Sequence, residues 1–153
     1  MSGENKFIWH NFEALSKNQL YDLSSLRQKV FIIEQQCFYE DLDYSDHSAC
    51  HLLVYNNQKM IGYSRVFPPG IKYNSASIGR IVVDKEFRQM GIGKMITLES
   101  IGFIENNFPD CDISISAQYR LVNFYENLGF EINGKVYLED DIENIKMVLK
   151  LKK

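Results

Sequence analysis

The feature that most constrains the fold is a glycine turn between a strand and a helix. Residues 75–83 are rich in isoleucine and valine and predict a strand, and residues 91–107, which Pro109 follows, predict a helix. The turn between them is Arg88-Gln-Met-Gly-Ile-Gly-Lys94. Helix N-termini expose free N–H groups, and glycines let an anion approach the backbone closely. The turn therefore predicts a phosphate-binding site, with an ordinary helix start as the alternative.

The charges around the turn favour a phosphate site, and its sequence argues against two familiar kinds. Residues 80–94 hold four cations and two anions, a local charge of +2, on a chain of net charge −3. A Walker A loop needs glycine at the position of Arg88 and serine or threonine at the position of Met95. A dinucleotide fingerprint needs glycine or alanine at the position of Ile96. ATP and NAD are therefore disfavoured, while other nucleotide phosphates stay open.

The whole chain predicts an α+β fold in a single domain, residues 1–153. The expected strands are 6–12, 51–55, 60–67, 75–83, 113–117, 130–136 and 145–151, and the expected helices are 17–36, 91–107 and 121–127. Ser16 and Gln19 match a capping box that starts the first helix, and Asn56-Asn57 matches a hairpin turn. The mixed element order predicts a mostly antiparallel sheet flanked by helices.

Composition narrows the function classes. The net charge of −3 argues against a general polyanion binder, so we expect no nucleic-acid partner. The uncharged apolar runs are far shorter than the roughly 18 residues of a membrane span, and no secretory signal is visible, so we expect a cytoplasmic protein. Cys37, Cys50 and Cys111 are odd in number and widely spaced, which favours reduced thiols over a disulfide frame or a metal site.

Two stretches of the chain resemble a known family. The segment from Gly79 to Lys94, with Asn123-Phe-Tyr-Glu-Asn-Leu-Gly-Phe130 downstream, resembles the GNAT superfamily of acyl-CoA-dependent N-acetyltransferases. The chain resembles the ElaA branch of that superfamily more closely. The residues that carry this resemblance are Arg27, Val30-Phe31, Glu34-Gln35, Cys37, the acidic residues 40–46, His51-Leu52 and Ala117-Gln118. One departure is Asn144, which stands where relatives in this branch carry a histidine.

The resemblance implies a GNAT fold and acetyl-CoA as cosubstrate. In this superfamily an R/Q-x-x-G-x-G/A turn wraps the pyrophosphate of CoA, a strand pairs with pantetheine, and a later asparagine contacts the CoA arm. The matching positions here are Ile81, Val82, Val83, Arg88, Gln89, Met90, Gly91, Ile92, Gly93, Lys94 and Asn123. The implied reaction is acetyl transfer to a primary amine of a small molecule or a peptide.

Amine acetylation needs one group that removes a proton and one that assists the leaving thiolate. An alkylammonium with a pKa of about 10.4 is only about 10^−3.4 neutral at pH 7, a deficit of about 4.6 kcal/mol. Glu34, His51 and Glu139 are the candidate proton acceptors, although solvated carboxylates and a structural histidine are alternatives. Tyr125 is the candidate donor to the thiolate, with a core tyrosine as the alternative.

The acidic segment 40–46 bears on the acceptor. Its carboxylates could steer a cationic amine toward the site, with solvated loop charge as the alternative. They do not match an EF-hand loop, which needs glycine at its sixth position and glutamate at its twelfth. Counting from Asp41, these positions hold Asp46 and Leu52. A second function class is a catalytically silent acyl-CoA-binding sensor. The sequence leaves the oligomeric state open, a homodimer included.

Overall fold

The computed structural model describes residues 3–151, so residues 1–2 and 152–153 of the expected domain lie outside it. The strands are β1 (Asn5–Asn11), β2 (Cys50–Asn56), β3 (Lys59–Phe67), β4 (Ala76–Val83), β5 (Ile113–Gln118), β6 (Glu131–Ile132), β7 (Tyr137–Glu139) and β8 (Ile142–Leu149). The helices are α1 (Lys17–Arg27), α2 (Ile92–Asn107) and α3 (Val122–Glu126), and a π-helical segment, η2 (Gln28–Glu34), continues α1. Short 3-10 turns lie at Phe12–Ala14, Ser45–Ser48, Lys85–Phe87 and Tyr119–Leu121.

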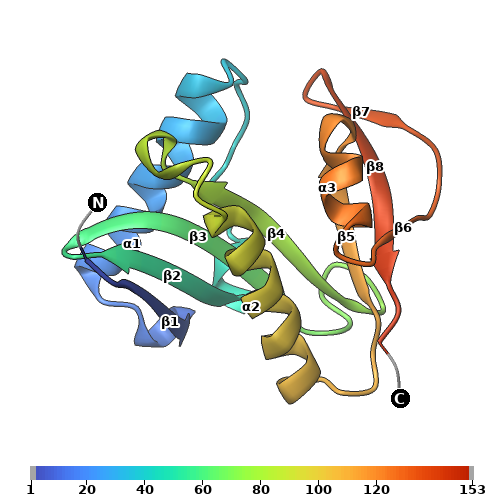
Figure 1. Cartoon of the computed structure of the whole chain (residues 1–153), viewed down its shortest axis with the longest axis horizontal. Coiled ribbons are helices and arrows are strands. Elements are labelled where there is room, and N and C mark those ends of the chain that lie inside the picture. The colour runs from blue at the N-terminus through green and yellow to red at the C-terminus, as the bar shows by residue number, and fades with distance from the viewer. Residues whose placement is uncertain (1–2, 152–153) are drawn as a thin grey trace.

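The strands form one mixed sheet in the order β1-β2-β3-β4-β5-β8-β6, with β7 also paired to β8 (Figure 1). β4 and β5 run parallel, and the other paired strands run antiparallel. The expected mostly antiparallel α+β arrangement is thereby confirmed.

Helices α1 and α2 cover opposite faces of the N-terminal half of the sheet. Side chains alternate across a strand, so Leu53 and Val54 of β2 face opposite sides. Leu53 packs in one cluster with Leu23 of α1, and Val54 packs in another with Ile96 of α2. All four side chains are fully buried, so both helices are fixed to the sheet by apolar contacts.

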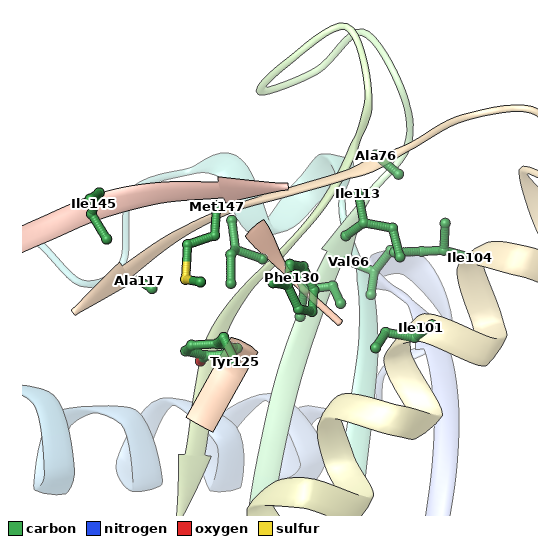
Figure 2. Close-up of a cluster of buried hydrophobic side chains, with 12 residues drawn as sticks. Val66, Ala76, Ile101, Ile104, Ile113, Ala117, Tyr125, Phe130, Ile145 and Met147 are labelled. Carbon is green, nitrogen blue, oxygen red and sulfur yellow. The ribbon is translucent and has the colours of Figure 1, made fainter. Parts of the chain in front are cut away.

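A third apolar cluster joins α2 to the C-terminal strands (Figure 2). It contains Ile101 and Ile104 of α2, Met147 of β8, Tyr125 of α3 and Phe130, which follows α3. This cluster fixes the short helix α3 against the sheet although five residues are too few for a helix to be stable alone.

Strands β4 and β5 diverge soon after they pair. Two residue pairs join β4 to β5, Ala76 with Ile113 and Ser77 with Ser114, whereas β5 pairs with β8 along its full length. β4 also carries a bulge against β3, and Arg80 at the bulge has φ +51. A bulge bends a strand, and a non-glycine residue at positive φ persists only where its surroundings hold it. The parting of β4 from β5 is visible in Figure 1.

The first helix begins as predicted and then changes type. The Ser16 side chain accepts from the Gln19 backbone, and the Gln19 side chain accepts from the Ser16 backbone, which confirms the capping box. The α-helix gives way to η2 well before the expected end, with wider bonds such as Gln35 N–H to the Val30 carbonyl at 3.2 Å. The β-branched and aromatic residues 30–33 have low α-helical propensity, which explains the change.

The closing strands also differ from expectation. The strand expected over 130–136 is reduced to the two residues of β6, and the unpredicted β7 forms a hairpin with β8. Asp140 and Asp141 form the turn at φ +51 and +64. Such turns usually carry asparagine or glycine, so the pair of aspartates gave no hairpin signal. Across residues 3–151, no helix combines the length and the apolar character that a membrane span needs.

Candidate active site

A cleft of about 790 Å³ opens where β4 and β5 diverge. Its volume lies in the range of small-molecule and cofactor sites, which runs from about 300 to 1,000 Å³. The predicted residues that line it are Ile81, Val82, Val83, Arg88, Gln89, Gly91, Ile92, Gly93, Lys94, Glu34, Glu139 and Tyr125. Met90 and Asn123 are exposed and do not line it.

The glycine turn forms one end of the cleft. Gly91 is the N-cap of α2 with φ +77, a conformation that favours glycine. No side chain of the described residues caps this helix, so its first backbone N–H groups are open to a ligand. The positive end of the helix dipole and the nearby Lys94 favour negative charge here. This end of the cleft is therefore suited to an anion.

Arg88 lies at the same end and is held by two partners. Its Nη1 is 2.7 Å from Oε2 of Glu34, and its Nε donates to the Val83 carbonyl at 3.1 Å. The Arg88 and Glu34 side chains are 38% and 32% exposed. Glu34, predicted as a proton acceptor, is thus in the cleft, but its carboxylate is paired with a cation.

Tyr125 lies beside the cleft on α3, and 8% of it is exposed. Its ring packs edge-on against Phe124 and Phe130, at centroid distances of 5.1 and 5.8 Å. Within residues 3–151 its hydroxyl makes no hydrogen bond. Burial raises the pKa of Tyr125 to about 12, although the charge of Arg120 acts against the shift. The phenol is therefore protonated at neutral pH and has a donor to offer.

His51 does not line the cleft. It is fully buried in β2, where Nδ1 accepts from the Tyr63 hydroxyl at 2.5 Å and Nε2 donates to the Asp46 carbonyl at 2.9 Å. A carbonyl only accepts, which fixes the proton on Nε2. Burial lowers the pKa of His51, although the Asp46 carbonyl and carboxylate act in the opposite direction. Both nitrogens are therefore engaged in the interior, which matches the alternative of a structural histidine and places His51 away from the cleft.

The acidic segment 40–46 is bound by three arginines, Arg27 at the end of α1, Arg65 in β3 and Arg80 in β4. The contacts are Arg27 Nε to Asp41 Oδ2 (2.9 Å), Arg27 Nη1 to Asp46 Oδ1 (2.8 Å), Arg65 Nη2 to Asp43 Oδ2 (2.7 Å), Arg65 Nη1 to Asp46 Oδ1 (2.8 Å) and Arg80 Nε to Asp41 Oδ1 (2.8 Å). Three carboxylates therefore balance three guanidinium groups. Both earlier expectations for Asp41, Asp43 and Asp46 are corrected, because these charges are neither solvated nor free to steer an amine.

The arginine network also holds the bulge of β4. Arg80 is fixed by Asp41, so its charge does not add to the positive potential expected at the glycine turn. The sequence carried one signal of this network. Arg27 lies on a helix face that is otherwise largely apolar. Arg65 and Arg80 lie in strands that are otherwise largely apolar. A charged residue in such a position needs a buried partner.

Acid is expected to unfold the protein through this network. Burial alone would raise the pKa of Asp46, but the charges and hydrogen bonds of Arg27 and Arg65 outweigh it and hold that pKa below its usual value. Burial of Asp43 is outweighed in the same way, chiefly by Arg65. A carboxylate with a depressed folded pKa contributes stability that is complete above its unfolded pKa of about 3.9 and is lost as the pH falls below that value.

We therefore expect a melting temperature that is nearly constant from about pH 7 to pH 5 and falls steeply below about pH 4. Thermal unfolding followed by circular dichroism from neutral to acidic pH measures this dependence. The Asp43→Asn variant removes one of the groups and should show a shallower acid limb. A melting temperature that stayed level to about pH 3 would contradict the assignment.

Hydrogen bonds join the two sides of the cleft. Cys37 Sγ donates to the Asp140 carbonyl at 3.3 Å, and the Gln118 side chain donates to that of Gln35 at 3.4 Å. Glu139, next to Asp140 in the sequence, lines the cleft and is exposed. The sequence missed three tyrosines that line the cleft, Tyr39, Tyr73 and Tyr137. They come from irregular segments and from β7, where no periodicity could place them.

The sequence matches the family model described as "Acetyltransferase (GNAT) domain" over residues 13–151. The chain belongs to the GNAT acetyltransferase family. The GNAT relative named protein ElaA, from Escherichia coli, is 33% identical over 135 residues, which are 87% of this chain and 88% of that protein. Its crystal structure gives a TM-score of 0.91 at 30% identity, over 96% of this chain and 100% of that one.

Two further GNAT-fold structures extend the comparison. An acyl-CoA N-acyltransferase from Pseudomonas aeruginosa gives a TM-score of 0.93 at 30% identity, over 96% of this chain and 100% of that one. A GNAT family acetyltransferase from Elizabethkingia anophelis, with acetyl-CoA bound, shares the fold at a TM-score of 0.69 and 18% identity, over 96% and 98% of the two chains. The expected GNAT fold is confirmed. Over residues 3–151, no group of three or more His, Cys, Asp or Glu side chains is arranged to hold a metal.

Proposed function

We propose that this GNAT protein transfers an acetyl group from acetyl-CoA to a primary amine of a small molecule or peptide, by direct attack in a complex that holds both substrates. The observation that carries the proposal is that one cleft joins the N-terminus of α2 to Tyr125, whose hydroxyl has no hydrogen-bond partner among residues 3–151. The first of these features suits an anionic cofactor and the second suits a leaving thiolate.

Acetyl-CoA would supply a thioester carbonyl, at which an amine nitrogen forms a C–N bond as the C–S bond breaks. Arg88 and the first amides of α2 would bind its pyrophosphate, and the backbone of residues 81–83 would pair with its pantetheine arm. The turn fits this role because a Cβ placed on Gly91 would meet no atom within 4 Å, so the space beside the amides is open. Met90 and Asn123, which do not line the cleft, are assigned no side-chain contact.

Glu139 is the proton acceptor that this proposal favours, acting directly or through a water molecule. Of the other two candidates, His51 is buried outside the cleft and Glu34 is paired with Arg88. Glu139 is exposed in the lining of the cleft, and no ion pair within residues 3–151 includes it. Its carboxylate would take the proton of the ammonium group and so free the lone pair of the nitrogen.

Tyr125 would donate a hydrogen bond to the sulfur as negative charge develops on it. Its pKa of about 12 lies well above the thiol value of about 8.5, so complete proton transfer would be uphill by about 5 kcal/mol. A hydrogen bond avoids that penalty and still stabilises the developing thiolate in a site that is partly shielded from water. The role that we propose for Tyr125 is thus donation, with the phenol protonated throughout.

Asn144 favours a second candidate function, an acyl-CoA-binding sensor without turnover. It lines the cleft with 7% exposed, and its amide donates to the Ile142 carbonyl at 2.8 Å. An asparagine side chain cannot accept a proton from an ammonium group, as a histidine at this position could. Release of free thiol in the presence of a broad amine panel separates the two functions, because a sensor binds acetyl-CoA and releases none.

The test of the proposed function is thermal unfolding with and without acetyl-CoA, with ATP and NAD as controls. A ligand at 100 times its Kd adds about 2.7 kcal/mol to the free energy of unfolding. For a chain of this length that corresponds to a rise in melting temperature of about 5 to 10 °C. We expect this rise with acetyl-CoA alone. The absence of a shift at millimolar acetyl-CoA would reject the proposal, and an equal shift with ATP would point to a general phosphate site.

A further inference from the structure

The pair formed by Glu34 and Arg88 connects two parts of the chain that are distant in sequence. Glu34 is the last residue of η2, and Arg88 begins the glycine turn. The Val83 carbonyl, at the end of β4, holds the Nε of Arg88, while Glu34 holds Nη1. Nη2 of Arg88 has no partner within residues 3–151. The guanidinium group is therefore oriented by the protein and keeps the N–H groups of Nη2 free to donate.

Glu34 reaches the cleft from one face of η2. Val30, Phe31, Glu34 and Gln35 all line it, which are positions i, i+1, i+4 and i+5. Residues at i and i+4 lie on the same face of a helix, and π-helical segments are frequent at functional sites. On the same segment, Lys29 reaches Asp84 at 3.5 Å. Two ion pairs therefore join η2 to the segment between β4 and α2.

We propose that Glu34 is a positioning residue that orients Arg88 for the pyrophosphate of acetyl-CoA. The inference rests on the proposed function for the identity of the cofactor. It gives Glu34 a different role from that of proton acceptor, because the carboxylate acts through Arg88 and touches neither the amine nor the thioester. An arginine whose guanidinium group is already oriented loses less side-chain freedom on binding a phosphate oxygen than an unrestrained arginine does.

The variant Glu34→Gln tests this role. Glutamine keeps the size of the side chain and removes the charge-assisted contact, so Arg88 is held by the Val83 carbonyl without the Glu34 ion pair. We expect the Kd for acetyl-CoA, measured by calorimetry, to rise about tenfold, with the KM for acetyl-CoA rising alike and kcat at saturating acetyl-CoA unchanged. The conservative variant Glu34→Asp retains the carboxylate and should recover part of the affinity. The pH profile of kcat should be that of the wild type.

Lys29→Gln is the matched control. It breaks the ion pair with Asp84 on the same segment, without touching Arg88, so it should leave both the Kd and kcat as in the wild type. Its melting temperature reports any general loosening of η2. A Glu34→Gln protein that bound acetyl-CoA as tightly as the wild type, or more tightly, would overturn the proposal.

Three results distinguish failure of this inference from failure of the proposed function. A fall in kcat at saturating acetyl-CoA, with an altered pH profile and an unchanged Kd, would show Glu34 to be the proton acceptor and overturn the positioning role. A wild-type protein that bound no acetyl-CoA would overturn the proposed function and this inference together. Wild-type binding with an unaffected Glu34→Gln variant would overturn this inference alone.

Discussion

Replacing Arg27 with methionine is expected to lower the free energy of unfolding by about 3 to 5 kcal/mol. The Arg27 side chain is fully buried and donates to Asp41 Oδ2 at 2.9 Å, to the Asp41 carbonyl at 2.7 Å and to Asp46 Oδ1 at 2.8 Å. Methionine fills a similar volume but leaves two buried carboxylates short of a cation. An uncompensated buried charge is what makes the loss large, because it can be relieved only by protonation or unfolding.

Thermal unfolding at pH 7 measures this loss. For a chain of this length, each kcal/mol corresponds to about 2 to 4 °C, so the melting temperature should fall by about 6 to 20 °C. Lys29→Met is the matched control, two residues along the same helical run, because the Lys29 side chain is 60% exposed. Its ammonium lies 3.5 Å from the buried Asp84 carboxylate, which Lys59 also reaches at 3.7 Å, so Asp84 keeps a cation in this variant and the loss should be smaller than in Arg27→Met. Similar losses in the two variants would refute the special role of the buried network.

The variant Tyr125→Phe is expected to lower kcat by about 100-fold and to leave the Kd for acetyl-CoA nearly unchanged. Phenylalanine keeps the ring that packs against Phe124 and Phe130 and removes only the hydroxyl. Because that hydroxyl makes no hydrogen bond within residues 3–151, its loss leaves no buried group without a partner. The effect should therefore appear in turnover and not in stability.

Initial rates of thiol release at saturating acetyl-CoA measure the change in kcat, and thermal unfolding checks the fold. Tyr119→Phe is the matched control, because Tyr119 is close in sequence, 47% exposed and not in the lining of the cleft. An unchanged kcat in Tyr125→Phe would remove the tyrosine from the mechanism. A loss of kcat that accompanied an equal loss in the control would show an indirect effect.

The parts of the fold that were predictable depend on local backbone chemistry. The capping box at Ser16 needs only residues within one turn of the chain. The hairpin between β2 and β3 was readable because Asn57 tolerates its φ of +56. The glycine turn was readable for the same reason, because Gly91 takes a left-handed conformation at the start of a helix. Each signal lies within a few residues of the feature that it specifies.

The parts that were not predictable depend on contacts between distant segments. The role of His51 is set by Tyr63 and the Asp46 carbonyl, and that of Glu34 is set by Arg88. A sequence shows that these groups exist but not which group each one meets. The family and the phosphate-binding character of the glycine turn could therefore be predicted from the sequence, whereas the contacts of individual carboxylates required the fold.

The divergence of β4 and β5 divides the sheet into two parts, one containing β1 to β4 and the other β5 to β8. At the closed end, near Ala76 and Ile113, the two parts share an apolar core with α2. Away from that end, the named contacts between them are two hydrogen bonds, from Cys37 to the Asp140 carbonyl and from Gln118 to Gln35. A molecule that contacts both parts of the sheet therefore spans the cleft away from its joined end, where these hydrogen bonds lie.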